Sequence, residues 1–230
     1  KMGILIWSEI PVYWTVSFAN ELTYTLAERQ LEEMIRRDKN RAAIILWGVA
    51  NETPLSEDRF VFLKKLAQKA RSLDATRLIT AALDTQSEKD GAKVIDDPLG
   101  AVVDVIGINS YCGWYYGKPS DCSGLKWENP YNKPMIMSEM GGGALAGLHG
   151  GADERWTEEY MDDVYKYNLE MLDNIPFLRG MTPWILMDFR SARRHLKNIQ
   201  KDFNRKGLIS EQGVRKKAFY RLQDYYKNKE

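Results

Sequence analysis

The sequence predicts an α/β fold of the (β/α)8 barrel type, and three features predict it. Short apolar runs alternate along the chain with longer segments of helical periodicity. Most of these runs are continuously apolar, which is typical of parallel strands buried on both faces. Two of the runs lead directly into a glutamate, Glu52 and Glu139. Strand ends converge on one face of such a barrel, so glutamates far apart in the sequence are expected to meet there.

Six segments are expected to be strands of this barrel. They are Gly3 to Trp7, Ala43 to Trp47, Arg77 to Ala82, Val102 to Ile108, Pro134 to Ser138 and Gly180 to Met187. A closed barrel of this type has eight strands. We therefore expect an incomplete barrel with about its last six β/α units. Because the first predicted strand lies at the very start of the chain, the chain is expected to be the C-terminal portion of a longer protein.

The predicted helices lie between these strands. Glu21 to Arg37 places apolar residues near helical spacing, and Phe60 to Ala70 shows the same stripe. Thr157 is a predicted N-cap because two acidic residues follow it, and acids in the first turn complement the helix dipole. The helix that it opens is expected to run to about Leu172. A final helix is expected over Lys216 to Tyr226.

Composition excludes several classes of protein. With 230 residues, of which 44% are hydrophobic, the chain can bury one large core. No linker divides it, so residues 1–230 are expected to form a single domain. A net charge of +1 argues against a broad nucleic-acid surface, and no apolar run approaches the ~20 residues of a membrane span. Cys112 and Cys122 are expected to be free thiols, although two nearby cysteines can form a bridge in an oxidising compartment.

Five motifs follow one another in a fixed order along nearly the whole chain. They are Gly3 to Pro11, Trp47 to Glu52, Asn109 to Tyr111, Ser138 to Gly141 and Trp184 to Phe189. In this order they resemble the catalytic barrel of glycoside hydrolase family 2, closest to its β-glucuronidases and β-galactosidases. The family's barrel begins with two further strands that carry active-site histidines, and β-sandwich domains precede it. The resemblance therefore implies an N-terminally truncated catalytic domain, and neither His149 nor His195 matches those histidines.

The resemblance implies a retaining glycosidase that acts on terminal β-glycosides by double displacement. Position by position, Glu139 matches the family's nucleophile and Glu52 matches its acid/base. Retention requires two carboxyl groups about 5 to 5.5 Å apart, one to attack the anomeric carbon and one to protonate the leaving oxygen. Asn51 matches the residue that hydrogen-bonds the sugar 2-hydroxyl, and Asn109 belongs to the same expected substrate-binding set. The alternative interpretation of either glutamate is a solvated acid in a loop.

Three aromatic residues extend the expected site. Tyr111 matches a tyrosine that lies beside the family's nucleophile, and Tyr115 matches one that reaches the sugar in β-glucuronidases. A phenol there can donate a hydrogen bond to the carboxylate. Trp184 matches the tryptophan that packs against the sugar, and core packing is the alternative. The neighbouring Trp114 and Tyr116 are expected to have structural roles.

The string Asn204-Arg205-Lys206-Gly207 bears on the identity of the sugar. In β-glucuronidases the Asn and Lys of this pattern lie against the substrate carboxylate, where a cation and an amide suit an anionic sugar. Asn204 and Lys206 are therefore expected to bind substrate, and β-glucuronidase is the leading prediction. Some β-galactosidases of the family carry a similar string, so that activity remains an alternative. Another is a catalytically silent barrel fragment, because catalysis needs a complete, preorganised site.

The expected partner is a carbohydrate substrate, with neither nucleic acid nor membrane involved. The proposed chemistry requires no metal ion and no organic cofactor. An incomplete barrel leaves open strand edges, and exposed edges tend to pair with other chains. Self-association, or an element that covers the edges, is therefore expected.

Overall fold

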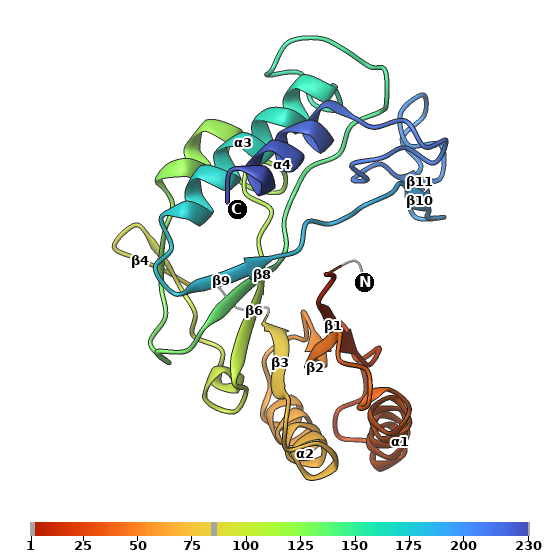
Figure 1. Ribbon diagram of the computed structural model, residues 1–230, viewed down its shortest axis with the longest axis vertical. Coiled ribbons are helices and arrows are strands. Elements are labelled where there is room, and N and C mark those ends of the chain that lie inside the picture. The colour runs from red at the N-terminus through yellow and green to blue at the C-terminus, as the bar shows by residue number, and fades with distance from the viewer. Residues whose placement is uncertain (1–2, 84–86, 230) are drawn as a thin grey trace. The chain divides into compact units, whose positions relative to one another are not determined.

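The computed structural model describes residues 3–83 and 87–229, which group into two compact units (Figure 1). The first unit comprises residues 1–109 and 127–136, and the second comprises residues 110–126 and 137–230. That the chain forms one domain stays a prediction. Within the described residues, no helix has both the length and the apolar character needed to cross a membrane.

Parallel strands form the centre of the first unit. Four of them are hydrogen-bonded side by side, and each neighbouring pair is parallel. The two middle strands are almost entirely buried, which accounts for their uninterrupted apolar sequence. In order, the four are β1 (Ile6–Glu9), β2 (Ile44–Asn51), β3 (Leu78–Leu83) and β6 (Val105–Asn109).

Two helices of the first unit lie on the same side of strands β1 to β3 (Figure 1). α1 (Glu21–Asp38) begins at Asn20, whose side-chain oxygen accepts hydrogen bonds from two backbone N–H groups of the first turn. α2 (Glu57–Leu73) begins at Ser56, which accepts one in the same way. Each helix turns its apolar stripe inward, as the periodicity predicts. The buried apolar residues of these stripes are Ala27, Leu31, Met34 and Ile35 in α1, and Phe62, Leu63, Leu66, Ala67 and Ala70 in α2.

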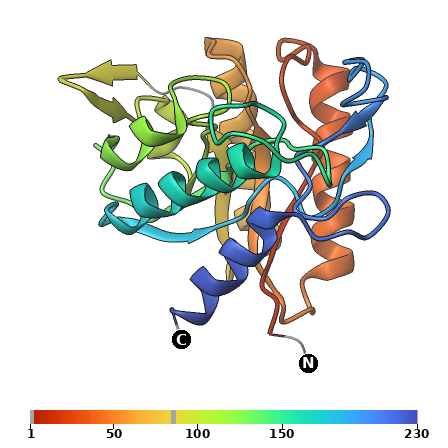
Figure 2. The ribbon, with the colours of Figure 1, turned by 90° about the horizontal axis from the view of Figure 1, so that it is seen from above.

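The second unit contains the end of β8 (Met135–Glu139) and a pair of packed helices. The N–H of Thr182 donates to the carbonyl of Met137 at 2.9 Å, which joins the segment after β9 (Leu178–Met181) to β8. α3 (Glu158–Asp173) and α4 (Lys217–Lys227) lie side by side (Figure 2). Between them Arg221 forms a two-pronged ion pair with Asp162, at 2.5 and 2.6 Å.

The remaining elements are short. A small sheet, a two-stranded ribbon and two 3-10 turns fall in segments without a regular apolar period, which is why they are absent from the predicted elements. They are β4 (Ser87–Lys89), β5 (Ala92–Val94), β7 (Lys126–Glu128), β10 (Phe189–Arg190), β11 (Phe203–Asn204), η1 (Pro98–Ala101) and η2 (Pro119–Gly124).

The predicted elements correspond closely to those observed. The six expected strands appear as β1, β2, β3, β6, β8 and β9, and the four helices end within a few residues of the expected positions. The second half of the last predicted strand is wrong, because β9 ends at Met181. Beyond it the backbone pairs elsewhere: the N–H of Trp184 donates to the carbonyl of Met140 at 2.9 Å.

Candidate active site

Glu52 is held by three hydrogen bonds within the first unit. It follows β2 directly with a φ of 49°, in the left-handed region that few residues other than glycine adopt. Its Oε2 accepts a hydrogen bond from Nε1 of Trp14 at 2.9 Å, and its Oε1 accepts one from Nδ2 of Asn109 at 2.9 Å. Its own N–H donates to the carbonyl of Ala82 at 3.0 Å. The carboxylate therefore has a fixed orientation at the end of the strand.

Asn109 brings two expected site residues together. Its Nδ2 also donates to Oδ1 of Asn51 at 2.9 Å, so Asn51, Glu52 and Asn109 are neighbours. Trp14 is not in the predicted set, although it contacts Glu52 directly. Its N–H donates to the carbonyl of Asn51 at 3.1 Å, which fixes its loop beside β2. Because this loop has no regular apolar period, the sequence pattern does not single out Trp14 as a site residue.

Gly48, in the middle of β2, makes room for two side chains of β1. Nε1 of Trp7 donates to Oε2 of Glu9 at 3.0 Å. A Cβ at Gly48 would lie 2.3 Å from Nε1 of Trp7 and 2.6 Å from Oε2 of Glu9. Only glycine fits under this pair, because real Cβ atoms do not approach other atoms so closely. Glu9, the last residue of β1, is thus a further carboxylate at a strand end.

Glu139, in the second unit, receives its hydrogen bond from a phenol. The side chain of Tyr111 donates to Oε2 of Glu139, and the N–H of Ser110 donates to the Glu139 carbonyl at 2.9 Å. The ring of Tyr111 packs edge-on against Tyr115, with centroids 5.1 Å apart. The structure therefore places both expected tyrosines in one chain of contacts that starts at Glu139.

Lys206 continues this chain of contacts. Its Nζ donates to the hydroxyl of Tyr115 at 2.7 Å and lies 4.7 Å from the centre of that ring. The lysine is buried, and burial lowers its pKa even though the bond to Tyr115 acts in the opposite direction. Burial raises the pKa of Tyr115, but the bond and charge of Lys206 and the charge of Arg194 outweigh it, so this pKa is lowered. The N–H of Lys206 donates to Oδ1 of Asn204 at 3.1 Å.

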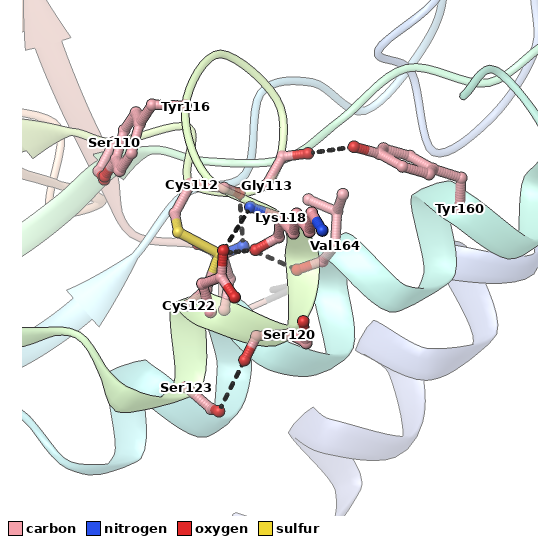
Figure 3. Close-up of a disulfide and its surroundings, with 12 residues drawn as sticks. Ser110, Cys112, Gly113, Tyr116, Lys118, Ser120, Cys122, Ser123, Tyr160 and Val164 are labelled. Atoms are coloured by element: carbon pink, nitrogen blue, oxygen red, sulfur yellow. Dashed lines mark hydrogen bonds between the residues drawn. A yellow bond between two sulfur atoms is a disulfide. The ribbon is translucent and has the colours of Figure 1, made fainter. Parts of the chain in front are cut away.

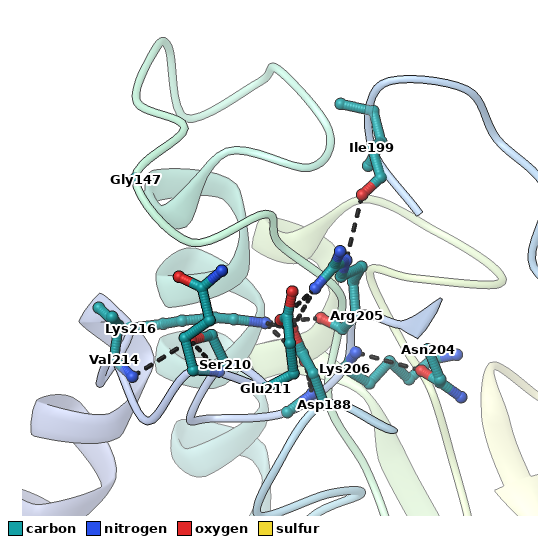
Figure 4. Close-up of polar contacts among 12 residues, drawn as sticks. Gly147, Asp188, Ile199, Asn204, Arg205, Lys206, Ser210, Glu211, Val214 and Lys216 are labelled. Atoms are coloured by element: carbon teal, nitrogen blue, oxygen red, sulfur yellow. Dashed lines mark hydrogen bonds and ion pairs between the residues drawn. The ribbon is translucent and has the colours of Figure 1, made fainter. Parts of the chain in front are cut away.

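A buried ion cluster fixes the backbone on either side of Lys206 (Figure 4). Asp188 accepts hydrogen bonds from the N–H of Gly207 at 2.8 Å and from Nζ of Lys216 at 2.8 and 3.0 Å. Lys216 also donates to the carbonyl of Arg205 at 3.0 Å, and Arg205 pairs with Glu211. Burial raises the pKa of Asp188 and lowers that of Lys216. A side chain at position 207 would collide with the Asp188 backbone, since its Cβ would lie 2.1 Å from that nitrogen.

Trp184 is half-buried and lies beyond β9. Its N–H bond to the carbonyl of Met140 places it next to the residue that follows Glu139, and its peptide bond to Ile185 is cis. The N–H of Ile185 donates to the carbonyl of Lys206 at 3.1 Å. Its ring packs edge-on against Phe189, with centroids 6.1 Å apart, and part of its surface is exposed.

The expectation of free thiols is wrong, because Cys112 and Cys122 form a disulfide (Figure 3). Their Cα atoms are 5.8 Å apart. Gly117 turns the intervening chain back with a φ of 65°, a conformation that glycine adopts without strain. Nδ2 of Asn168, on α3, donates to the carbonyl of Cys112 at 3.0 Å. The bridge therefore closes the segment that carries Tyr115 and anchors it on α3.

The neighbouring aromatic residues have the structural roles expected of them. Trp114 is buried and packs with Tyr160 and Val164 in an apolar cluster. Tyr116 shares a 2.6 Å hydrogen bond with Oγ of Ser110. These contacts hold the segment between Tyr111 and η2 in place.

A pocket of about 160 Å³ lies beside Lys206 in the second unit. Its walls are aromatic, cationic and amide side chains, and no acidic residue lines it. Five of its lining residues lie outside the predicted set, in irregular segments where no periodic pattern singles them out: Trp114, Arg155, Trp156, Arg194 and Gln200. Among residues 3–83 and 87–229, no group of three His, Cys, Asp or Glu side chains is placed to hold a metal ion.

Comparison with known proteins gives consistent matches. Residues 7–229 match the model of the family described as glycosyl hydrolases family 2, TIM barrel domain. The β-glucuronidase of Mus musculus is 32% identical over 241 residues, which cover 98% of this chain and 35% of that protein. The β-glucuronidase of Paenibacillus borealis is 29% identical over 238 residues, covering 95% and 38%. This chain therefore spans little more than a third of the length of these relatives.

A solved structure agrees with the sequence matches. The β-glucuronidase of an uncultured Clostridium sp. superposes with a TM-score of 0.86 at 28% identity. The match covers 98% of this chain and 40% of that one.

Proposed function

Because this chain belongs to glycosyl hydrolase family 2, whose TIM barrel domain it matches over residues 7–229, we propose that it forms the catalytic part of a retaining β-glucuronidase. The family assignment, together with the parallel strands of the first unit, confirms the predicted α/β barrel class. The proposed substrate is a carbohydrate, as the relatives' names suggest.

In the proposed mechanism Glu139 attacks the anomeric carbon while the bond from that carbon to the leaving oxygen breaks. Glu52 donates its proton to the leaving oxygen. In the second step Glu52 takes a proton from water, the water oxygen attacks the same carbon, and the ester to Glu139 breaks. Support comes from each glutamate's own surroundings. Tyr111 orients Glu139, while Trp14 and Asn109 orient Glu52.

The observation that favours a uronate is the buried ammonium of Lys206. A buried cation is costly unless a partner compensates for lost hydration, and a substrate carboxylate supplies that partner. A neutral galactoside has no charged group for this position. Asn204 adds an amide in the same pocket, and Trp184 is proposed to pack against the sugar.

Hydrolysis of two substrates by the same protein tests this proposal. We expect 4-nitrophenyl β-D-glucuronide to be cleaved in preference to the β-D-galactoside. Lys206→Ala should lower kcat/KM for the glucuronide by roughly 10- to 100-fold, the effect of losing a charged hydrogen bond, and change the galactoside little. The exposed Lys197, replaced by Ala, is the matched control.

Equal losses on both substrates would rule out carboxylate recognition by Lys206. Preference for the galactoside would favour the alternative activity. Hydrolysis of neither would favour a catalytically silent domain.

A further inference from the structure

The pocket beside Lys206 carries more positive charge than one carboxylate needs. Three cations line it, Lys206, Arg155 and Arg194, and none of its lining residues is acidic. The ion pairs among the described residues include none with these three side chains. The charge of Glu139 acts on Lys206 from outside the pocket. Like charges placed together are unfavourable, and with no acidic residue in its lining this pocket suits a strongly anionic ligand.

Both arginines are held in place by the protein. The guanidinium of Arg155 lies 4.2 Å from the centre of the Trp114 ring, a stacking contact that suits its planar group. The side chain of Arg194 hydrogen-bonds Tyr115, another residue of the pocket wall, and its backbone is held by the carbonyl of Ser191 and the N–H of Asp202, both at 2.9 Å. The two guanidinium groups therefore belong to the pocket wall.

The hydrogen-bond donors exceed the needs of a single carboxylate. Lys206 and the amide nitrogen of Asn204 suffice for its two oxygens. Oδ1 of Asn204 accepts a hydrogen bond from the N–H of Lys206, so it is the amide nitrogen that can donate to a ligand. Arg155 and the further N–H groups of Arg194, which also bonds Tyr115, add guanidinium donors that suit a second oxyanion. The pocket volume of about 160 Å³ is well above the roughly 10 to 15 Å³ that one water molecule needs on the same measure. The pocket therefore has room for more than one small polar group.

The contacts indicate where on the sugar the second anion lies. Tyr115, which lines the pocket and bonds Lys206, packs against the ring of Tyr111, which bonds Glu139. In a uronate the carboxylate carbon is bonded to C5, and C4 is the neighbouring ring carbon that carries a hydroxyl, so an ester on that hydroxyl lies close to a carboxylate held by Lys206. The second anion therefore lies on the sugar itself and not on the leaving group.

We propose that this pocket binds two oxyanions together, the carboxylate of a terminal uronate and a sulfate ester on its C4 hydroxyl, the latter through Arg155 and Arg194. This inference rests on the proposed β-glucuronidase function and narrows its substrate class to doubly anionic uronates.

Isothermal titration calorimetry of the 230-residue chain tests the proposal with three ligands. They are methyl β-D-glucuronide, its 4-O-sulfate, and methyl β-D-glucoside. We expect the sulfated uronide to bind at least roughly tenfold more tightly than the unsulfated one, because a single charge-assisted hydrogen bond contributes about that gain in affinity. Arg155→Met and Arg194→Met should each remove most of this gain, whereas Lys197→Met, which removes a charge outside the pocket, should retain it. Circular dichroism checks that each variant folds.

Equal or weaker binding of the sulfated uronide would overturn the proposal, as would a gain that survives in both arginine variants. The proposed function fails separately, if methyl β-D-glucuronide binds no more tightly than the glucoside. In that case, weaker binding of the sulfated ligand by the arginine variants would still support the second anion site, and unchanged binding would overturn it. Absence of binding by every ligand would overturn both.

Discussion

Glu52 and Glu139 are held by different kinds of hydrogen-bond donor. Glu52 receives N–H groups from an indole and an amide, and Glu139 receives a phenolic O–H. A hydroxyl hydrogen can rotate, so the hydroxyl of Tyr111 can reorient when a glycosyl ester forms at Glu139 and that carboxylate loses its charge. The N–H donors of Trp14 and Asn109 are fixed by their rings and amide planes. The hydroxyl donor thus suits the nucleophile proposed at Glu139, and the N–H donors hold the orientation of Glu52.

The pH dependence of substrate binding is expected to follow Lys206. Burial lowers its pKa, so its ammonium loses a proton at a lower pH than an exposed lysine does. Only the ammonium attracts a carboxylate, and KM for a glucuronide should therefore rise as the pH rises through that lowered pKa. KM for a neutral galactoside should stay level over the same range. Steady-state kinetics between about pH 6 and pH 10 measures both, and parallel profiles would contradict this account.

At the scale of elements, the long helices and buried strands could be predicted because their signals are local. α1 and α2 show their apolar stripes within a single segment, and β2 reads as an unbroken apolar run. The expected substrate residues could be placed only through motif resemblance. Asn109 and Glu52 are 57 residues apart, and no local pattern links them.

Other features escape prediction because they depend on contacts between irregular segments. Trp14, Arg155 and Arg194 lie in loops, and their roles become visible only from what they touch. The disulfide depends on a turn that brings Cys112 back to Cys122, and spacing alone is compatible with free thiols as well.

The segment around Lys206 is expected to depend on the buried ion cluster. Replacing Lys216 by Met leaves the Asp188 carboxylate buried with less compensation, which should lower the free energy of unfolding by about 3 to 5 kcal/mol. Urea denaturation measures this change. The matched control is Lys217→Met at the neighbouring, exposed position. A similar, small effect of both substitutions would show that the cluster does not stabilise the fold.

The disulfide is expected to stabilise the segment that carries Tyr115. A bridge that closes a loop of this length, with a sequence separation of 10, contributes about 2 to 4 kcal/mol in the chain-entropy model. The double replacement Cys112→Ser and Cys122→Ser should therefore lower the Tm and reduce activity on glucuronides. Thermal unfolding with and without a reducing agent gives the same comparison in the wild type. An unchanged Tm in both experiments would argue against the bridge in solution.

At the scale of the whole molecule, the expected self-association stays a prediction, and the first unit offers a place for it. β1 stands at the end of the strand order, and the residues before it, Ile4 and Leu5, are 60% and 67% exposed. Exposed apolar edges recruit further strands. Sedimentation velocity should show a concentration-dependent dimer or larger species that Leu5→Lys weakens. Leu22→Lys, on the exposed side of α1, should have no such effect. A wild-type chain that stays monomeric at all concentrations would refute self-association.

The identity of the nucleophile is tested most directly by covalent labelling. The protein is incubated with a cyclophellitol-type inactivator of glucuronic configuration, its intact mass is measured, and the adduct is located by peptide mapping. We predict one adduct per chain, on Glu139, that is absent in Glu139→Gln and does not form with the galactose-configured inactivator. No adduct, or an adduct on another residue, would contradict the proposal that Glu139 is the nucleophile of a retaining β-glucuronidase.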